Sequence, residues 1–139
     1  MNNLQVETQD AKYLERYENW FDRATTNILL KETRHLGLSS QDTQLWTGSI
    51  DGEVIAVALF YIDEMHDGHL DFAVKPSERR QGIGTELMSR VLAEPLLKNS
   101  SKIQVEVATE NTAGQKILQK NGFVRIGYTP EGLLEFIKR

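Results

Sequence analysis

The chain has 139 residues, 40% of them hydrophobic and 26% charged, which predicts one domain, residues 1–139, with an ordinary globular composition. The absence of cysteine excludes disulfides, a thiolate nucleophile and cysteine-based zinc sites, and without a long apolar run or an apolar leader we expect a cytoplasmic protein with no membrane partner. The net charge of −4 argues against nucleic acid as a partner, because nucleic-acid binding needs a basic face.

The N-terminal part of the chain predicts an edge strand followed by a helical region. Met1 to Glu7 is the short candidate edge strand. From Asp10 to Leu36 apolar residues recur every three or four positions, which predicts an amphipathic helix, or two helices with a break near Thr25 to Asn27. Gly37 is the expected end of this region.

Three strands are predicted next. Gln44 to Ile50 and Glu53 to Ile62 flank Asp51-Gly52, a strong signal for a hairpin with a two-residue turn. Because the second of these strands is apolar at every position after Glu53, we expect it to be covered on both faces. His69 to Val74 is the third strand, and Pro76 ends it.

The C-terminal half alternates helices and strands. A helix is expected from Gly82 to about Ala93, a strand from Ile103 to Val107, a second helix from Asn111 to Asn121, and strands from Phe123 to Tyr128 and from Leu133 to Ile137. This order predicts a mixed sheet with helices packed on it, an α/β (α+β) fold.

The segment Arg79-Arg80-Gln81-Gly82-Ile83-Gly84 places two glycines at the start of the first of these helices. Glycine allows a ligand to approach the backbone closely, and the first turn of a helix carries unpaired N–H groups and partial positive charge. Together these features predict a socket for a diphosphate. A dinucleotide fingerprint does not fit, because Leu87 stands at its third glycine, and a Walker loop would need Gly-Lys-Ser/Thr. The alternative is a glycine-rich loop that only turns the chain.

With Val74-Lys75-Pro76 before it, this loop resembles the main motif of the GNAT superfamily of acetyl-CoA N-acetyltransferases, Arg/Gln-x-x-Gly-x-Gly/Ala. Val105 to Asn111, followed by Gly122-Phe123, is similar to the family's second motif, and the two occur in the family's order and spacing. The resemblance covers nearly the whole chain. It implies a GNAT-type fold, with a mixed, mostly antiparallel central sheet flanked by helices and a cofactor cleft between splayed central strands. It also implies acetyl-CoA as cosubstrate.

The resemblance assigns binding roles position by position. The backbone of Phe72, Ala73 and Val74 is expected to hydrogen-bond the pantetheine arm and the acetyl carbonyl. Asn111 is expected to contact the cofactor arm, and it also suits the N-cap of the second helix. The pyrophosphate is expected to lie on the loop that consists of Arg79, Arg80, Gln81, Gly82, Ile83, Gly84 and Thr85.

Direct attack of an amine on the thioester needs a proton acceptor, because an alkylamine with a pKa of about 10.4 is mostly protonated at neutral pH. We expect Glu106 to be this base, since some protein-directed members of the family carry a catalytic glutamate there. An exposed strand glutamate is the alternative. Asp71 and His69 are weaker candidates.

The tyrosine that often serves as general acid in the family would stand at position 118, which is Leu118 here. Tyr128 is the first substitute and Tyr61 the second, although both also suit packing. The group His66, Asp67, His69 and Asp71 suggests a metal site, but a polar hairpin loop explains it more simply, so no metal is expected.

Three functions remain open at this point. The first is an active N-acetyltransferase whose acceptor is a primary amine, either a small amine or a protein N-terminus or lysine. The second is a non-catalytic acyl-CoA-binding or sensor domain of the same fold, which Leu118 supports. The third is an interaction domain with an accidental loop. The resemblance is compatible with a homodimer that pairs through an edge strand or a helix.

Overall fold

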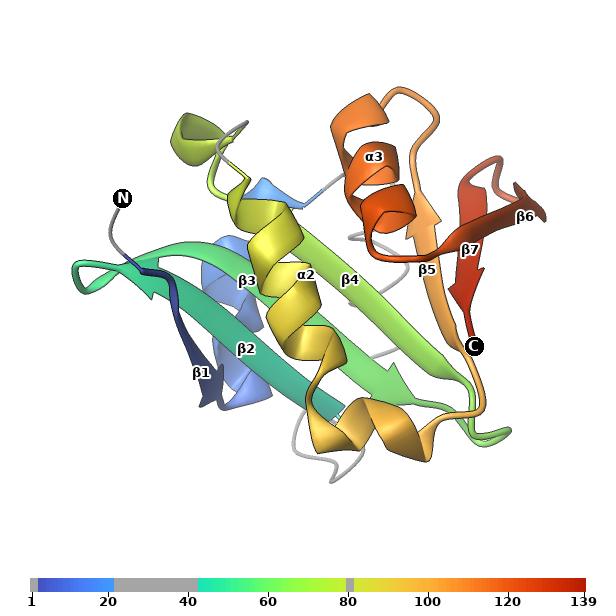
Figure 1. The fold of residues 1–139 in the computed structure, drawn as a ribbon, viewed down its shortest axis with the longest axis horizontal. Coiled ribbons are helices and arrows are strands. Elements are labelled where there is room, and N and C mark those ends of the chain that lie inside the picture. Colours follow the sequence, from blue (N-terminus) through green and yellow to red (C-terminus); the bar gives the residue numbers. More distant parts are fainter. Residues whose placement is uncertain (1–2, 22–42, 80–81) are drawn as a thin grey trace.

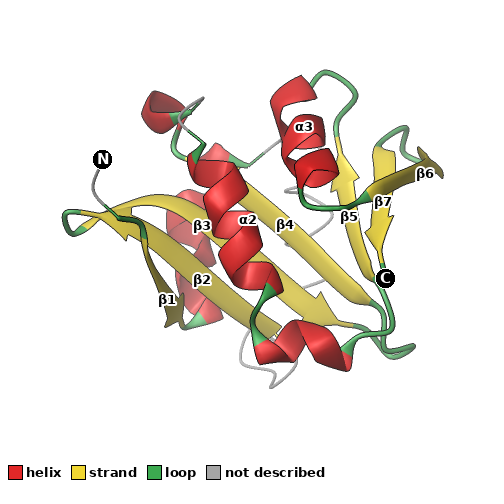
Figure 2. Ribbon diagram, in the orientation of Figure 1, coloured by secondary structure: helices red, strands yellow, loops and turns green. Residues whose placement is uncertain are grey.

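The computed structural model describes residues 3–21, 43–79 and 82–139, which form a sheet with helical segments on both faces (Figures 1 and 2). The rest of the predicted N-terminal helical region, with Gly37, lies outside the described residues. None of the helices in the described ranges is both long and apolar enough to cross a membrane. In chain order, with η for 3₁₀ helices, the elements are β1 (Gln5–Gln9), η1 (Ala11–Trp20), β2 (Thr43–Ile50), β3 (Glu53–Ile62), β4 (Gly68–Val74), η2 (Pro76–Glu78), α2 (Ile83–Leu92), η3 (Pro95–Asn99), β5 (Ile103–Val107), α3 (Thr112–Lys120), β6 (Val124–Tyr128) and β7 (Leu134–Lys138).

The sheet has the strand order β1-β2-β3-β4-β5-β7-β6. Every neighbouring pair is antiparallel except β4 and β5, which run parallel. This confirms the predicted mixed, mostly antiparallel sheet. The predicted hairpin is also present: Asp51 and Gly52 join β2 to β3 with φ angles of 52° and 81°, the left-handed conformation that a two-residue hairpin turn requires.

Apolar clusters lie on both faces of the sheet, and the one on the second face covers β2, β3 and β4. On one face, here called the α2 face, Trp46, Phe60 and Leu70 pack in one cluster with α2 residues such as Leu87 and with Leu118 of α3. On the opposite face, the η1 face, the cluster consists of Ala11, Leu14, Phe21, Leu45, Val57, Leu59, Tyr61 and Ala73. β3 lies between the two clusters and is buried from Ile55 to Ile62, which confirms that this strand is covered on both faces.

The structure differs from the sequence predictions mainly near the N-terminus. The edge strand runs from Gln5 to Gln9 rather than from Met1 to Glu7, and the Asp10 side chain then caps η1 by accepting the Lys12 N–H at 2.9 Å. η1 is a 3₁₀ helix. A spacing of three and four residues cannot separate 3.0 from 3.6 residues per turn over so short a segment.

Both predicted ends of α3 are confirmed. The Asn111 side chain accepts the Gly114 N–H at 2.9 Å and so caps the first turn. At the other end Gly122 has a φ of 85°, and the Phe123 N–H donates to the Leu118 carbonyl at 3.0 Å. This is the left-handed glycine cap that returns the chain toward β6.

Candidate active site

The central feature of the site is the incomplete pairing of β4 with β5. The two strands run parallel but pair only at Gly68↔Ile103 and His69↔Gln104. Beyond these positions they diverge toward the ends that carry the start of α2 and the start of α3 (Figure 1). This confirms the splayed central strands that the sequence led us to expect. We call the unpaired region between them the β4–β5 opening.

The backbone of β4 presents alternate residues to this opening. The Lys75 N–H donates to the Ile55 carbonyl at 2.8 Å, so the odd-numbered residues of β4 bond to β3 and the even-numbered ones face β5. The Gly68 N–H, which donates to the Lys102 carbonyl at 2.8 Å, agrees with this parity. Phe72 and Val74 therefore direct their backbone groups into the opening, whereas Ala73 directs its own toward β3.

The N-terminus of α2 lies at the same opening. Gly82 is left-handed, with φ 78° and ψ 3°, and the first helical bond runs from the Glu86 N–H to the Gly82 carbonyl at 3.1 Å. The N–H groups of Ile83, Gly84 and Thr85 therefore have no partner inside the helix. No side chain of the described residues caps this helix start. These donors can receive an anionic ligand.

Close packing holds this helix start beside β4 and α3. A Cβ added at Gly84 would lie 3.3 Å from Val74 Cγ2 and 2.7 Å from Ile117 Cδ1, so only glycine fits there without a shift of its neighbours. At Gly82, by contrast, an added Cβ would meet no atom of the described residues within 4 Å. The described part of the chain thus leaves space above Gly82. Arg80 and Gln81, expected to bind the same pyrophosphate, lie outside the described residues.

The two described cations before this helix are already bonded within the chain. Lys75 Nζ pairs with Glu53 Oε1 at 2.7 Å, and this hydrogen bond raises the pKa of Lys75. Arg79 donates from Nε to the Val74 carbonyl at 3.1 Å and from Nη2 to the Trp20 carbonyl at 2.9 Å. Arg79 therefore joins the end of β4 to the end of η1, and a guanidinium has further N–H groups besides these two donors.

The η1 face of the opening is acidic. Cross-strand register places Glu106 of β5 directly opposite Glu135 of β7. The two strand pairs at the start of β5 put His69 beside Gln104, so Asp71 and Glu106, two residues further along each strand, flank the opening on the same face. Like charges on facing positions of a sheet repel each other. The described geometry thus combines hydrogen-bond donors for an anion at one end with carboxylates for a cation on this face.

Comparison with known proteins identifies the class to which this geometry belongs. The family model described as "Acetyltransferase (GNAT) family" matches residues 7–123. The chain belongs to the GNAT acetyltransferase family. No curated protein sequence matches the chain. The recognition of this family from the two motifs is confirmed, and the prediction of an acetyltransferase agrees with it.

Solved structures share the GNAT fold at low sequence identity. Spermidine N-acetyltransferase from Vibrio cholerae in complex with CoA and spermine has a TM-score of 0.71 at 14% identity, covering 97% of this chain and 94% of that one. A putative acetyltransferase from Salmonella typhimurium with its cofactor acetyl-CoA has 0.70 at 16%, covering 99% and 94%. The aminoglycoside acetyltransferase AAC(6')-Ib in complex with coenzyme A has 0.66 at 20%, covering 98% and 94%. The expected fold class is thereby confirmed.

Within the GNAT framework the expected acid residues do not gather at the opening. Leu118, at the position of the usual tyrosine, is fully buried in the core of the α2 face. Tyr128 lies on the outermost strand, β6, opposite Leu134 of the α2 face, and its hydroxyl accepts a hydrogen bond from Arg125 at 2.7 Å. The structure does not bring Tyr128 together with Glu106, because β7 separates their two strands and Tyr128 lies on the α2 face.

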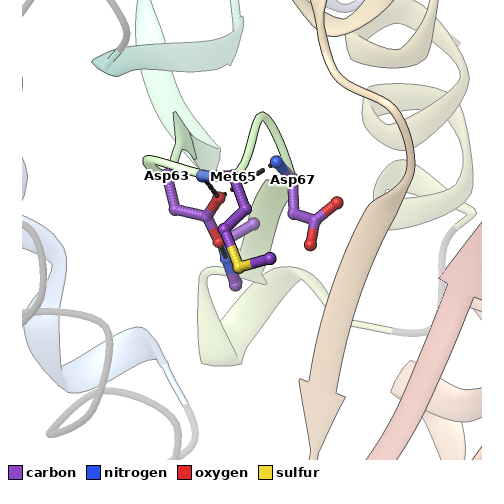
Figure 3. Close-up of polar contacts among 4 residues, drawn as sticks. Asp63, Met65 and Asp67 are labelled. Carbon is purple, nitrogen blue, oxygen red and sulfur yellow. Dashed lines mark hydrogen bonds and ion pairs between the residues drawn. The ribbon is translucent and has the colours of Figure 1, made fainter.

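A second polar group lies where β3 turns into β4. Tyr61 stacks on His69 with ring centroids 4.6 Å apart, and His69 Nε2 lies 2.8 Å from Asp63 Oδ2. The other Asp63 oxygen accepts the N–H groups of Met65 and Asp67, at 2.8 and 3.0 Å (Figure 3). Asp63 thus organises the loop. Nowhere in the described ranges do three or more His, Asp or Glu side chains form a group that could hold a metal ion.

Replacing Asp63 by asparagine is expected to lower the free energy of unfolding by about 1 kcal/mol near neutral pH, because a charged hydrogen-bond acceptor is lost. Burial raises the pKa of Asp63, but the hydrogen bonds from His69, Asp67 and Met65 outweigh it and hold the pKa below 3.8. Such a carboxyl stabilises the fold above its unfolded pKa and loses this effect as the pH falls through the folded value.

The difference in the free energy of unfolding between wild type and Asp63→Asn is therefore expected to be constant at neutral pH and to shrink below pH 3.8. Urea unfolding at a series of pH values measures it. Glu64→Gln, in the same loop and exposed, is the matched control and is expected to leave stability unchanged at every pH. A difference that grows as the pH falls would contradict the role given to Asp63.

Proposed function

We propose that this protein is an N-acetyltransferase that moves an acetyl group from acetyl-CoA to a primary amine by direct attack. The observation that carries the proposal is the β4–β5 opening, with the donors of Phe72 and of the α2 N-terminus at one end and carboxylates on its η1 face. Family membership supports the acetyl transfer, and two of the similar structures contain CoA and one contains acetyl-CoA. In this proposal residues 1–139 act as one domain, in the cytoplasm.

The residues present fit the cosubstrate. The N–H groups at the start of α2, with Arg80 and Gln81 before them, hold the pyrophosphate, because a helix N-terminus provides donors and partial positive charge. The backbone groups of Phe72 and Val74 hold the pantetheine arm and the acetyl carbonyl. The Oδ1 atom of Asn111 accepts the Gly114 N–H as the cap of α3. In this proposal Asn111 contacts the cofactor arm through its side-chain NH₂ group.

Glu106 is the proposed general base. It accepts the proton that the amine nitrogen loses as it bonds to the thioester carbon, and the Phe72 N–H stabilises the negative charge that develops on the carbonyl oxygen. The C–S bond then breaks and CoA leaves as a thiolate, which a thiol pKa near 8.5 makes a fair leaving group. Protonation by Tyr128 stays a prediction, which Tyr128→Phe tests directly.

The acceptor we propose is a cationic primary amine, either a small amine or a protein N-terminus or lysine. Glu106 and Glu135, both half-buried on the η1 face, and a net charge of −4 support a cation. Among the similar structures, one is named a spermidine and one an aminoglycoside acetyltransferase. The outermost strand, β6, exposes Val124, Ile126 and Tyr128, and this supports a homodimer as a further part of the proposal.

The test is the release of free thiol from acetyl-CoA in the presence of a panel of amines. We expect release that depends on the acceptor and is fastest with amines that carry a second positive charge. Neutral analogues of equal length are the control. Acetyl-CoA binding without release across the whole panel would instead favour a non-catalytic sensor, the candidate that the buried Leu118 supports.

A further inference from the structure

One backbone N–H at the opening, that of Phe72, donates to a side chain and not to the backbone of a neighbouring strand. In a regular parallel ladder the N–H groups of the even-numbered β4 residues donate to every second carbonyl along the segment that contains β5. The Gly68 N–H donates to the Lys102 carbonyl, so a continued ladder would have the Phe72 N–H donate to the Glu106 carbonyl. Because pairing ends at His69↔Gln104, that bond is not made. The Phe72 N–H donates to Oδ1 of Asp71 instead, at 2.8 Å.

This contact places a carboxylate on the donor that a thioester carbonyl would need. The Asp71 side chain is 9% exposed and belongs to the η1 face, so its oxygen reaches round the edge of β4 to the Phe72 N–H. A hydrogen bond to an ionised acceptor is stronger than one to a neutral carbonyl. Asp71 therefore competes with any neutral ligand for this N–H, and it satisfies a backbone donor that the incomplete β4–β5 ladder leaves without its strand partner.

We propose that the Asp71 carboxylate is a displaceable cap on the Phe72 N–H. The carbonyl oxygen of the acetyl group takes over this N–H, and the displaced carboxylate turns along the η1 face to the acceptor ammonium group beside Glu106. Asp71 is thus a positioning residue that couples the arrival of acetyl-CoA to recognition of the amine. The inference rests on the proposed function, because it assigns the acetyl carbonyl to Phe72.

Two consequences distinguish a displaceable cap from a purely structural role for Asp71. CoA has no carbonyl at this point, so it leaves the cap in place, and only acetyl-CoA has to displace it. Loss of the cap should therefore favour acetyl-CoA over CoA. The carboxylate becomes available to the amine only after displacement, so loss of its charge should raise the acceptor KM more than it changes acetyl-CoA binding.

The experiment measures the dissociation constants of acetyl-CoA and CoA by calorimetry for the wild type, Asp71→Ala and Asp71→Asn. Asp71→Ala is expected to bind acetyl-CoA about fivefold more tightly and CoA within about twofold of the wild type, on the scale of one hydrogen bond. Asp71→Asn keeps a weaker, neutral cap and is expected to lie between the two for acetyl-CoA, with a raised acceptor KM. Asp63→Asn, a carboxylate lost outside the opening, is the matched control and keeps the wild-type ratio.

A second readout needs no variant, so it decides the matter even if Asp71→Ala fails to fold. In the free protein and with CoA bound, the amide proton resonance of Phe72 is expected to follow the titration of the Asp71 carboxyl. With acetyl-CoA bound it should not. Equal changes in acetyl-CoA and CoA affinity, or a Phe72 resonance that follows the same titration with acetyl-CoA bound, overturn the cap. Failure of the proposed function would look different, because the wild type would then bind no acetyl-CoA or release no thiol.

Discussion

Replacing Gly82 by alanine is expected to weaken acetyl-CoA binding at least about tenfold, because a single unfavourable contact of about 1.4 kcal/mol corresponds to that factor. The Cβ of alanine would meet no atom of the described residues within 4 Å, so it would occupy the space that we propose for the pyrophosphate above the α2 N–H groups. Calorimetric titration with acetyl-CoA measures the loss.

Gly52→Ala is a closely matched control for this variant. Gly52 has a φ of 81° against 78° for Gly82, and an added Cβ there also meets no atom within 4 Å in the described part of the chain. Both variants therefore carry the same left-handed strain, about 1–2 kcal/mol, and should lose similar stability. Only Gly82→Ala should lose affinity. Equal acetyl-CoA affinities for the two variants would contradict the proposal that the loop at Gly82 binds acetyl-CoA.

Replacing Glu106 by glutamine is expected to lower kcat about 100-fold or more, the scale of general base catalysis, with acetyl-CoA affinity unchanged. The side chain keeps its shape but no longer accepts the proton of the amine. Steady-state release of thiol with a saturating cationic amine measures kcat, and calorimetry measures the affinity. The split between the two distinguishes catalysis from cofactor binding.

Glu135→Gln removes the same charge one strand further from the opening and is the control. We expect it to raise the acceptor KM and to lower kcat less than about tenfold, because it contributes to the field that attracts the amine and accepts no proton. If Glu106→Gln kept a kcat within a few-fold of the wild type, the base would have to be sought elsewhere on the η1 face, with Asp71 first.

The elements of the fold could be predicted from local patterns. The Asp51-Gly52 turn, the buried run of β3, the stripe of α2 and both caps of α3 all follow from spacing and residue type over a few positions. For most elements the observed boundaries differ from the predicted ones by no more than one residue. At β1 they moved further, since an edge strand that pairs on one side has its ends set by β2 rather than by its own sequence.

The arrangement of the site depended on information that no local pattern contains. The sequence alone does not predict a role for Glu135, because its place opposite Glu106 depends on the β5–β7 register, which joins segments about thirty residues apart. The bond from Phe72 to Asp71 follows from where the parallel ladder stops. Alternation within β4 separates Ala73 from its neighbours Phe72 and Val74, because only Ala73 directs its backbone groups toward β3.

The short ladder between β4 and β5 also has a mechanical meaning. Two register pairs, Gly68↔Ile103 and His69↔Gln104, are the strand pairing that the described residues show between the part of the sheet from β1 to β4 and the part from β5 to β6. From His69 to Val74 the strand extends about 16 Å, so a rotation of about 5° at the ladder moves its far end by about 1.4 Å. A rotation about the ladder would therefore act through a long lever arm. At the far end Gly84 lies so close to its neighbours that an added Cβ would come within 3.3 Å of Val74 and 2.7 Å of Ile117, so α2 packs tightly between β4 and α3 there.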